Sequence, residues 1–145
     1  MTSIKFTIPL VTLFVASAFF QAPVQAGPAE ELFRECVDHI RNVVHRCNSE
    51  NVETARRCVE RIERLLAAGK VKEARRLAAH CIDEIQHTTE SSEDALVQAC
   101  RRCIDRLLHL GAPELARRLK HVCVRAVRSI HSVEEESIDW IKAAF

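Results

Sequence analysis

The sequence predicts an all-α protein of antiparallel helical-hairpin repeats that disulfides staple together. The chain repeats itself at an offset of 42 residues: when residues 54–87 are aligned with residues 96–129, eleven of the 34 pairs are identical. Glycine and proline are scarce and tyrosine is absent, a composition that favours helix over sheet. Apolar residues recur at spacings of three and four, which is typical of amphipathic helices. Repetition at this period indicates supersecondary units that bury a face against each other.

The first 26 residues have the pattern of a secretory signal peptide. A short segment with one lysine precedes an apolar run from Phe6 to Phe20, and small residues follow before Gly27. An apolar run of about 15 residues is shorter than the roughly 20 residues that a membrane-spanning helix needs. We therefore expect residues 27–145 to form a single secreted or periplasmic domain with no membrane span.

Five longer helices and a short sixth one are predicted in this domain. The first helix extends from Pro28 to Cys47 and ends at the polar stretch 48–51. The second helix begins at an Asn51 cap and ends at Gly69, a residue type that easily takes the left-handed conformation after a helix. The third helix follows Gly69 and ends at a polar loop, residues 88–92.

The fourth helix follows a capping box at Ser91 and ends at Gly111. Pro113 opens the fifth helix, because a proline is tolerated in the first turn. Another capping box at Ser132 opens a short C-terminal helix that ends near Phe145. The pattern is compatible with both a short open solenoid and a closed bundle.

Each of the five longer helices carries a cysteine on its apolar stripe. The midpoint between Cys58 and Cys81 falls beside Gly69, so both residues stand equally far from that turn on antiparallel helices. Cys100 and Cys123 stand in the same way about the next glycine turn. The spacing therefore predicts two equivalent hairpin disulfides.

The remaining cysteine pairings stay open. Cys81 and Cys100 are also symmetric about the predicted loop 88–92, so a bridge between successive repeats is an alternative. Cys36 and Cys47 are about 16 Å apart along one helix, too far to bridge each other. One of them is expected to pair with Cys103, which leaves an odd cysteine that stays free or links two copies of the chain.

A cysteine on every helix also fits a second hypothesis, a periplasmic protein that binds Cu or Zn through thiol and histidine ligands. Most of the seven histidines lie off the cysteine stripe, and no closely spaced cysteine pair faces another. Cys100 and Cys103 have the spacing of a redox motif, but they lie inside a helix with no strand before it. We therefore favour disulfides and expect no metal or cofactor.

No catalytic motif stands out, so we expect a binding or structural module of the envelope or extracellular space, and no enzyme. Residues 101–128 hold eight basic and two acidic residues, whereas residues 83–94 hold five acidic and no basic ones. The basic run predicts a face for another protein or an anionic envelope component, and we do not expect nucleic acid to bind. Its candidate residues are Arg101, Arg102, Arg117, Arg118, Arg125 and Arg128.

Overall fold

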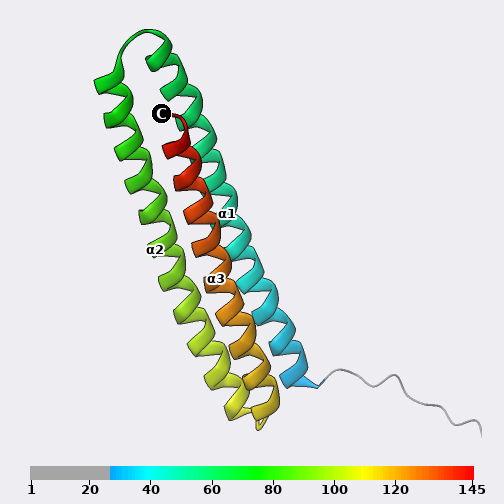
Figure 1. Cartoon of the computed structure of the whole chain (residues 1–145). Coiled ribbons are helices and arrows are strands. Elements are labelled where there is room, and N and C mark those ends of the chain that lie inside the picture. The colour runs from blue at the N-terminus through cyan, green and yellow to red at the C-terminus, as the bar shows by residue number, and fades with distance from the viewer. Residues whose placement is uncertain (1–26) are drawn as a thin grey trace, which may run out of the picture.

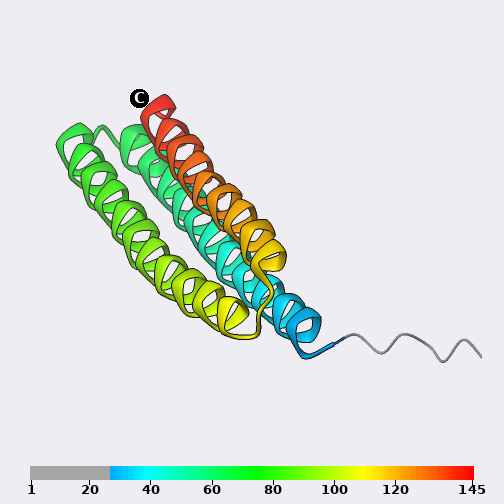
Figure 2. The same cartoon turned by 90° about the horizontal axis from the view of Figure 1, so that it is seen from below.

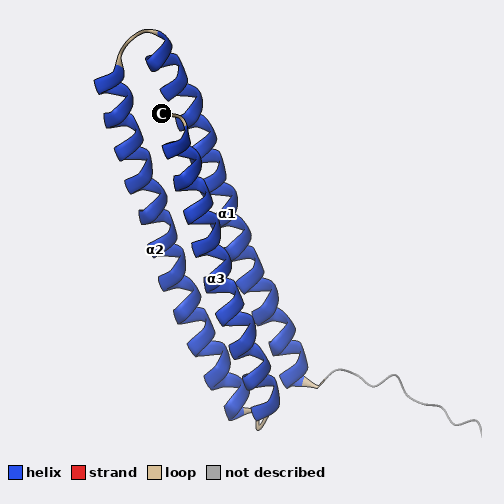
Figure 3. Cartoon of the chain, in the orientation of Figure 1, coloured by secondary structure: helices blue, strands red, loops and turns tan. Residues whose placement is uncertain are grey.

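The computed structural model describes residues 27–145, which form three long helices that run up, down and up (Figure 1). Every pair of helices is in contact, so the architecture is a closed three-helix bundle (Figure 2). The all-α prediction is confirmed, and the described part of the chain has no strand (Figure 3). The predicted signal peptide lies outside the described residues. The helices are α1 (Pro28–Ala67), α2 (Val71–His109) and α3 (Pro113–Ala143).

Both turns of the bundle fall at the glycines that the sequence indicates. Gly69 and Gly111 each have a φ of 71°, in the left-handed region that favours glycine. Backbone bonds close the helix before each turn: the Lys70 N–H donates to the Leu65 carbonyl at 2.9 Å, and Ala112 bonds in the same way at the second turn. Pro113 opens α3, as the sequence predicts.

The prediction of five longer helices and a short sixth one is wrong, because α1, α2 and α3 continue through the expected loops. Polar residues of the expected loops lie instead at mid-height in the bundle, where Asn48, Asn51 and Thr89 bond to residues of neighbouring helices. Asn51 Nδ2 donates to Thr89 Oγ1 at 2.9 Å, and Asn48 Nδ2 donates to Ser129 Oγ at 3.2 Å. A helix accommodates such residues when their side chains find partners in the folded protein.

We call these four residues together with Cys47 the polar layer. The core consists of two apolar clusters, and Cys47 also belongs to the first of them. The cluster nearer Gly111 joins the N-terminal part of α1 to the hairpin of α2 and α3, the second hairpin. The cluster nearer Gly69 joins the hairpin of α1 and α2, the first hairpin, to the C-terminal part of α3. In that cluster Ile138 and Ile141 of α3 take part, together with Ala144 at the C-terminal cap of the helix.

Three disulfides tie α2 to both neighbouring helices. The bonded pairs are Cys36–Cys103, Cys58–Cys81 and Cys100–Cys123. The second and third are the hairpin bridges that the spacing predicts, and the alternative bridge between Cys81 and Cys100 is wrong.

The continuity of α1 explains why Cys36, and not Cys47, pairs with Cys103. The midpoint of Cys36 and Cys103 is 69.5, the same as for the Cys58–Cys81 pair, so a single antiparallel register about the Gly69 turn brings both pairs face to face. Cys47 lies in the polar layer, with only 1% of its surface exposed. A bridge from Cys47 to a second copy would require this side chain to leave the core.

Candidate functional site

Each hairpin of the bundle has one face covered by the third helix and one face that is open. The open face of the second hairpin carries a groove of about 480 Å³ between α2 and α3. We call this surface the groove, and its lining residues are Glu93, Val97, Cys100, Arg101, Ile104, Cys123, Val124, Val127 and Arg128.

The walls of the groove are apolar and solvent-exposed. Val97 on α2 and Val124 on α3 expose 37% and 43% of their surface, and Ile104 and Val127 are partly buried. The Cys100–Cys123 disulfide joins the two walls. A covalently fixed, exposed apolar surface of this kind is suited to binding another molecule.

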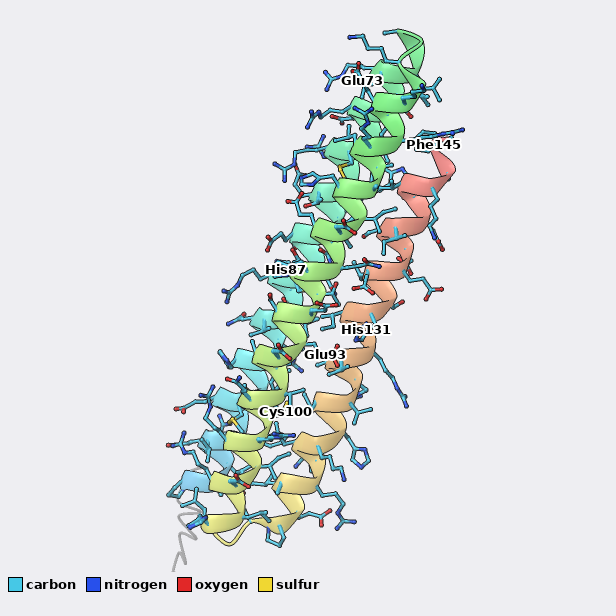
Figure 4. The ribbon with its side chains drawn as sticks, turned by 90° about the vertical axis from the view of Figure 1, so that its left-hand side faces the viewer. Glu73, His87, Glu93, Cys100, His131 and Phe145 are labelled. Atoms are coloured by element: carbon cyan, nitrogen blue, oxygen red, sulfur yellow. A yellow bond between two sulfur atoms is a disulfide. The ribbon has the colours of Figure 1, made fainter. Side chains whose placement is uncertain are left out.

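Charged residues frame the groove. Arg101 rises from α2 and Arg128 from α3, and both are exposed. At the end nearer the polar layer, Glu93 Oε2 lies 2.6 Å from Nε2 of His131 and connects the two helices. Figure 4 shows these two side chains between α2 and α3, with Cys100 further toward the Gly111 turn. Glu93 is thus hydrogen-bonded across the groove, whereas Arg101 and Arg128 have no ion-pair partner among the described residues.

The open face of the first hairpin is different in character. Its hollow is smaller, about 220 Å³. The exposed residues there are charged or polar: Arg57, Arg61, His80 and Glu84. The lining residues are Thr54, Arg57, Cys58, Arg61, Leu77, His80, Cys81 and Glu84.

The six arginines of the predicted basic face do not form one surface. Only Arg101 and Arg128 share the groove. Arg125 lines a separate hollow between α1 and α3, and Arg118 stacks over the Phe33 ring, 4.9 Å from its centroid. The remaining two, Arg102 and Arg117, are exposed, and Arg117 is paired with Glu114 of its own helix.

The polar layer holds a second candidate, the unpaired thiol of Cys47. It contributes to a cavity of about 360 Å³ whose other lining residues include His87 and Ser92. Burial raises the pKa of the Cys47 thiol, and the charge of Glu50 acts in the same direction, whereas a hydrogen bond with Ser92 opposes them. A thiol with a raised pKa is a poor nucleophile at neutral pH.

Thiol-based metal binding is limited by the disulfides, which engage six of the seven cysteines. Within residues 27–145, no three His, Cys, Asp or Glu side chains gather closely enough to hold a metal ion. The same residues contain no helix that is long and apolar enough to cross a lipid bilayer.

Sequence reasoning identified the arginines but missed the valines of the groove. Val97 and Val124 correspond to Ala55 and Ile82 at the 42-residue offset, and Ala55 is fully buried in the structure. The alignment alone did not reveal that one copy of the repeated face is covered and the other open. Searches against protein-family models, curated proteins and solved structures find no match to this chain.

Proposed function

We propose that this chain is an exported, disulfide-braced helical scaffold that binds another protein through the groove and performs no catalysis. Three disulfides in a small helical domain are typical of proteins that work in an oxidising compartment outside the cytosol. They also fix the two helices that form the groove relative to each other. A rigid binding surface loses little conformational entropy on association.

The observation that carries the proposal is the contrast between the two open faces. On the first hairpin the open face holds Arg61, His80 and Glu84, whereas the groove exposes Val97 and Val124. Single exposed valines such as Val52 are normal on a protein surface, but Val97 and Val124 line one groove together with Ile104 and Val127. A contiguous apolar surface of this kind is typical of a site that a partner covers.

A photo-crosslinking amino acid at position 124, introduced into the protein in its native host, tests this function. We expect a covalent adduct with a partner protein, and we expect Arg101→Glu with Arg128→Glu to abolish it. The matched control is the same crosslinker at Val52, which is 48% exposed on α1 outside the groove. The proposal is wrong if position 124 gives no adduct, or only the adducts that position 52 gives.

A further inference from the structure

The nine residues of the groove all have counterparts 42 positions earlier, and in the first hairpin a helix covers that surface. The counterparts are Asn51, Ala55, Cys58, Val59, Ile62, Cys81, Ile82, Ile85 and Gln86. Seven of them are buried, Ile82 is partly buried and Gln86 is exposed. Most of these counterparts belong to one core cluster, into which Ile138 and Ile141 of α3 and the C-cap residue Ala144 pack. The groove is thus a second copy of a helix-binding surface whose first copy is occupied.

The geometry of three helices around one axis explains why the second copy stays open. Superimposing α1 on α2 reverses the direction of the bundle, since neighbouring helices are antiparallel. When the second hairpin is superimposed on the first, the bundle axis is reversed, and the order of the three helices around that axis changes between clockwise and anticlockwise. The helix that is not part of the hairpin therefore lies on the opposite face of the second hairpin. There α1 packs with Cys103, Val122 and Ala126.

The counterparts of those three residues confirm that the covered and open faces exchange between hairpins. They are Arg61, His80 and Glu84, which line the polar open face of the first hairpin. The first hairpin is therefore polar where it is open. The open face of the second hairpin, in contrast, remains apolar. The apolar surface continues toward the Gly111 turn with Leu108, which is 51% exposed, whereas its counterpart Leu66 packs into the core cluster.

On this surface three of the four charge differences between the open copy and the covered copy are basic, and the fourth is Glu93, which replaces Asn51 and bonds to His131. Val59, Ala78 and Gln86 of the first hairpin are replaced by Arg101, Lys120 and Arg128. All three basic side chains are exposed. A partner that fits this surface carries acidic residues beside an apolar stripe.

The segment that occupies the first copy has this chemistry. Residues 132–145 contain four acidic residues and one lysine, and their apolar stripe is spaced by three residues at Ile138, Ile141 and Ala144. This spacing places the three side chains along one side of a helix. This segment therefore shows which kind of helix packs on the covered copy of the repeated surface.

We propose that the groove binds an acidic amphipathic α-helix of another protein in the pose that residues 132–145 adopt on the first hairpin. This inference rests on the proposed function and names the class of partner. Since α3 runs parallel to α1 (Figure 1), the guest helix runs parallel to α2, with its N-terminus near Val97 and its C-terminus near Leu108. Its apolar stripe covers the valines, and its acidic residues face Arg101, Lys120 and Arg128.

The experiment uses the oxidised protein, residues 27–145, and a fluorescent peptide with the sequence of residues 132–145. Fluorescence anisotropy at low salt should show saturable binding, and a scrambled peptide of the same composition should bind at least about tenfold more weakly. Val97→Glu with Val124→Glu should weaken binding by at least about tenfold, as should Arg101→Glu with Arg128→Glu, a difference of about 1.4 kcal/mol. Both valines are exposed, so the variants should fold.

Matched controls are Val52→Glu and Arg75→Glu with Arg76→Glu, which alter exposed residues outside the groove and should change affinity less than about twofold. Equal binding of the scrambled peptide, or binding that the groove variants do not alter, overturns the proposal. So does a protein dimer in sedimentation equilibrium that Val97→Glu with Val124→Glu disperses, because the occupant is then a second copy. If the peptide does not bind while position 124 still crosslinks to a partner, the helix class is wrong and the binding function stands. If both fail, both are wrong.

Discussion

Cys47 is the one unpaired cysteine of the described chain, and its surroundings keep it protonated. Only 1% of its surface is exposed. Burial is the largest cause that raises its pKa, and nearby Glu50 adds to the shift, while hydrogen bonds with Ser92 and Thr89 oppose it. The residue therefore acts as a small buried side chain of the polar layer rather than as a reactive thiol.

Replacing Cys47 by alanine should remove part of the pH dependence of stability. The native thiol holds its proton more tightly than the unfolded one, so the free energy of unfolding falls as pH rises from the ordinary thiol pKa of 9.0 toward the raised native value. Urea unfolding at several pH values from about 7 to 9.5 should show a steeper fall for the wild type than for Cys47→Ala. At pH 7 the variant should cost about 1 kcal/mol of lost packing. Parallel pH profiles would show that the thiol has equal pKa values in both states.

The helices are long because residues typical of loops remain helical in the polar layer, where their side chains bond across the bundle. Thr89 illustrates this: its hydroxyl accepts a bond from Asn51 of α1 and donates to the Ile85 carbonyl of its own helix at 3.1 Å. Asn51 and Thr89 are both fully buried, so the pair also fixes the register of α1 against α2.

Continuous helices predict slow hydrogen exchange through the polar layer. Amides of residues 88–92 should be protected to a degree similar to those of neighbouring helical residues, because each donates within α2. The Gly69 turn supplies the comparison: amides 68–70 also donate hydrogen bonds, but they lie at an exposed helix end and should exchange faster. Native-state exchange followed by NMR makes the measurement. Exchange at residues 88–92 as rapid as at the turn would show that these residues form a loop and that α2 is not continuous.

The disulfides should differ in how much they stabilise the bundle. Cys58–Cys81 closes a separation of 23 residues, for which the loss of chain entropy in the unfolded state predicts a stabilisation of about 3.4 kcal/mol. Cys36–Cys103 closes a separation of 67 residues, and the predicted stabilisation is about 4 kcal/mol once the loop is shortened by the Cys58–Cys81 bridge within it. Replacing both cysteines of a pair by alanine avoids a stray thiol. Denaturant unfolding without reductant should show the larger loss for the Cys36–Cys103 pair. A smaller loss there than for Cys58–Cys81 would mean that the N-terminal part of α1 contributes little to cooperative unfolding.

The two turns and the hairpin disulfides could be predicted because each follows from local chemistry. Gly69 and Gly111 sit where a positive φ requires glycine, and cysteines equidistant from such a turn face each other. The predicted breaks at 48–51 and 88–92 are wrong, because the hydroxyl that accepts a hydrogen bond from Asn51 Nδ2 lies on another helix. The same assumed break hid the pairing of Cys36 with Cys103.

The groove could not be predicted because it depends on the arrangement of all three helices. A 42-residue alignment gives the repeated surface twice, but the order of helices around the bundle axis decides which copy α3 covers. α2 belongs to both hairpins and to all three disulfides. The three helices are therefore covalently connected, and the second hairpin presents an unoccupied copy of the surface that α3 covers in the first hairpin.

NMR of the ¹⁵N-labelled protein, with the peptide of residues 132–145 added in steps, locates the binding surface residue by residue. The account predicts that the largest chemical-shift changes occur at Val97, Leu108 and Val124, with little change at His80 and Glu84 on the polar open face of the first hairpin. Shifts concentrated instead around Val59 and the protein's own Ile138–Ala144 segment would mean that the peptide only replaces α3. That result, or the absence of any shift, would contradict the assignment of the groove as a helix-binding site.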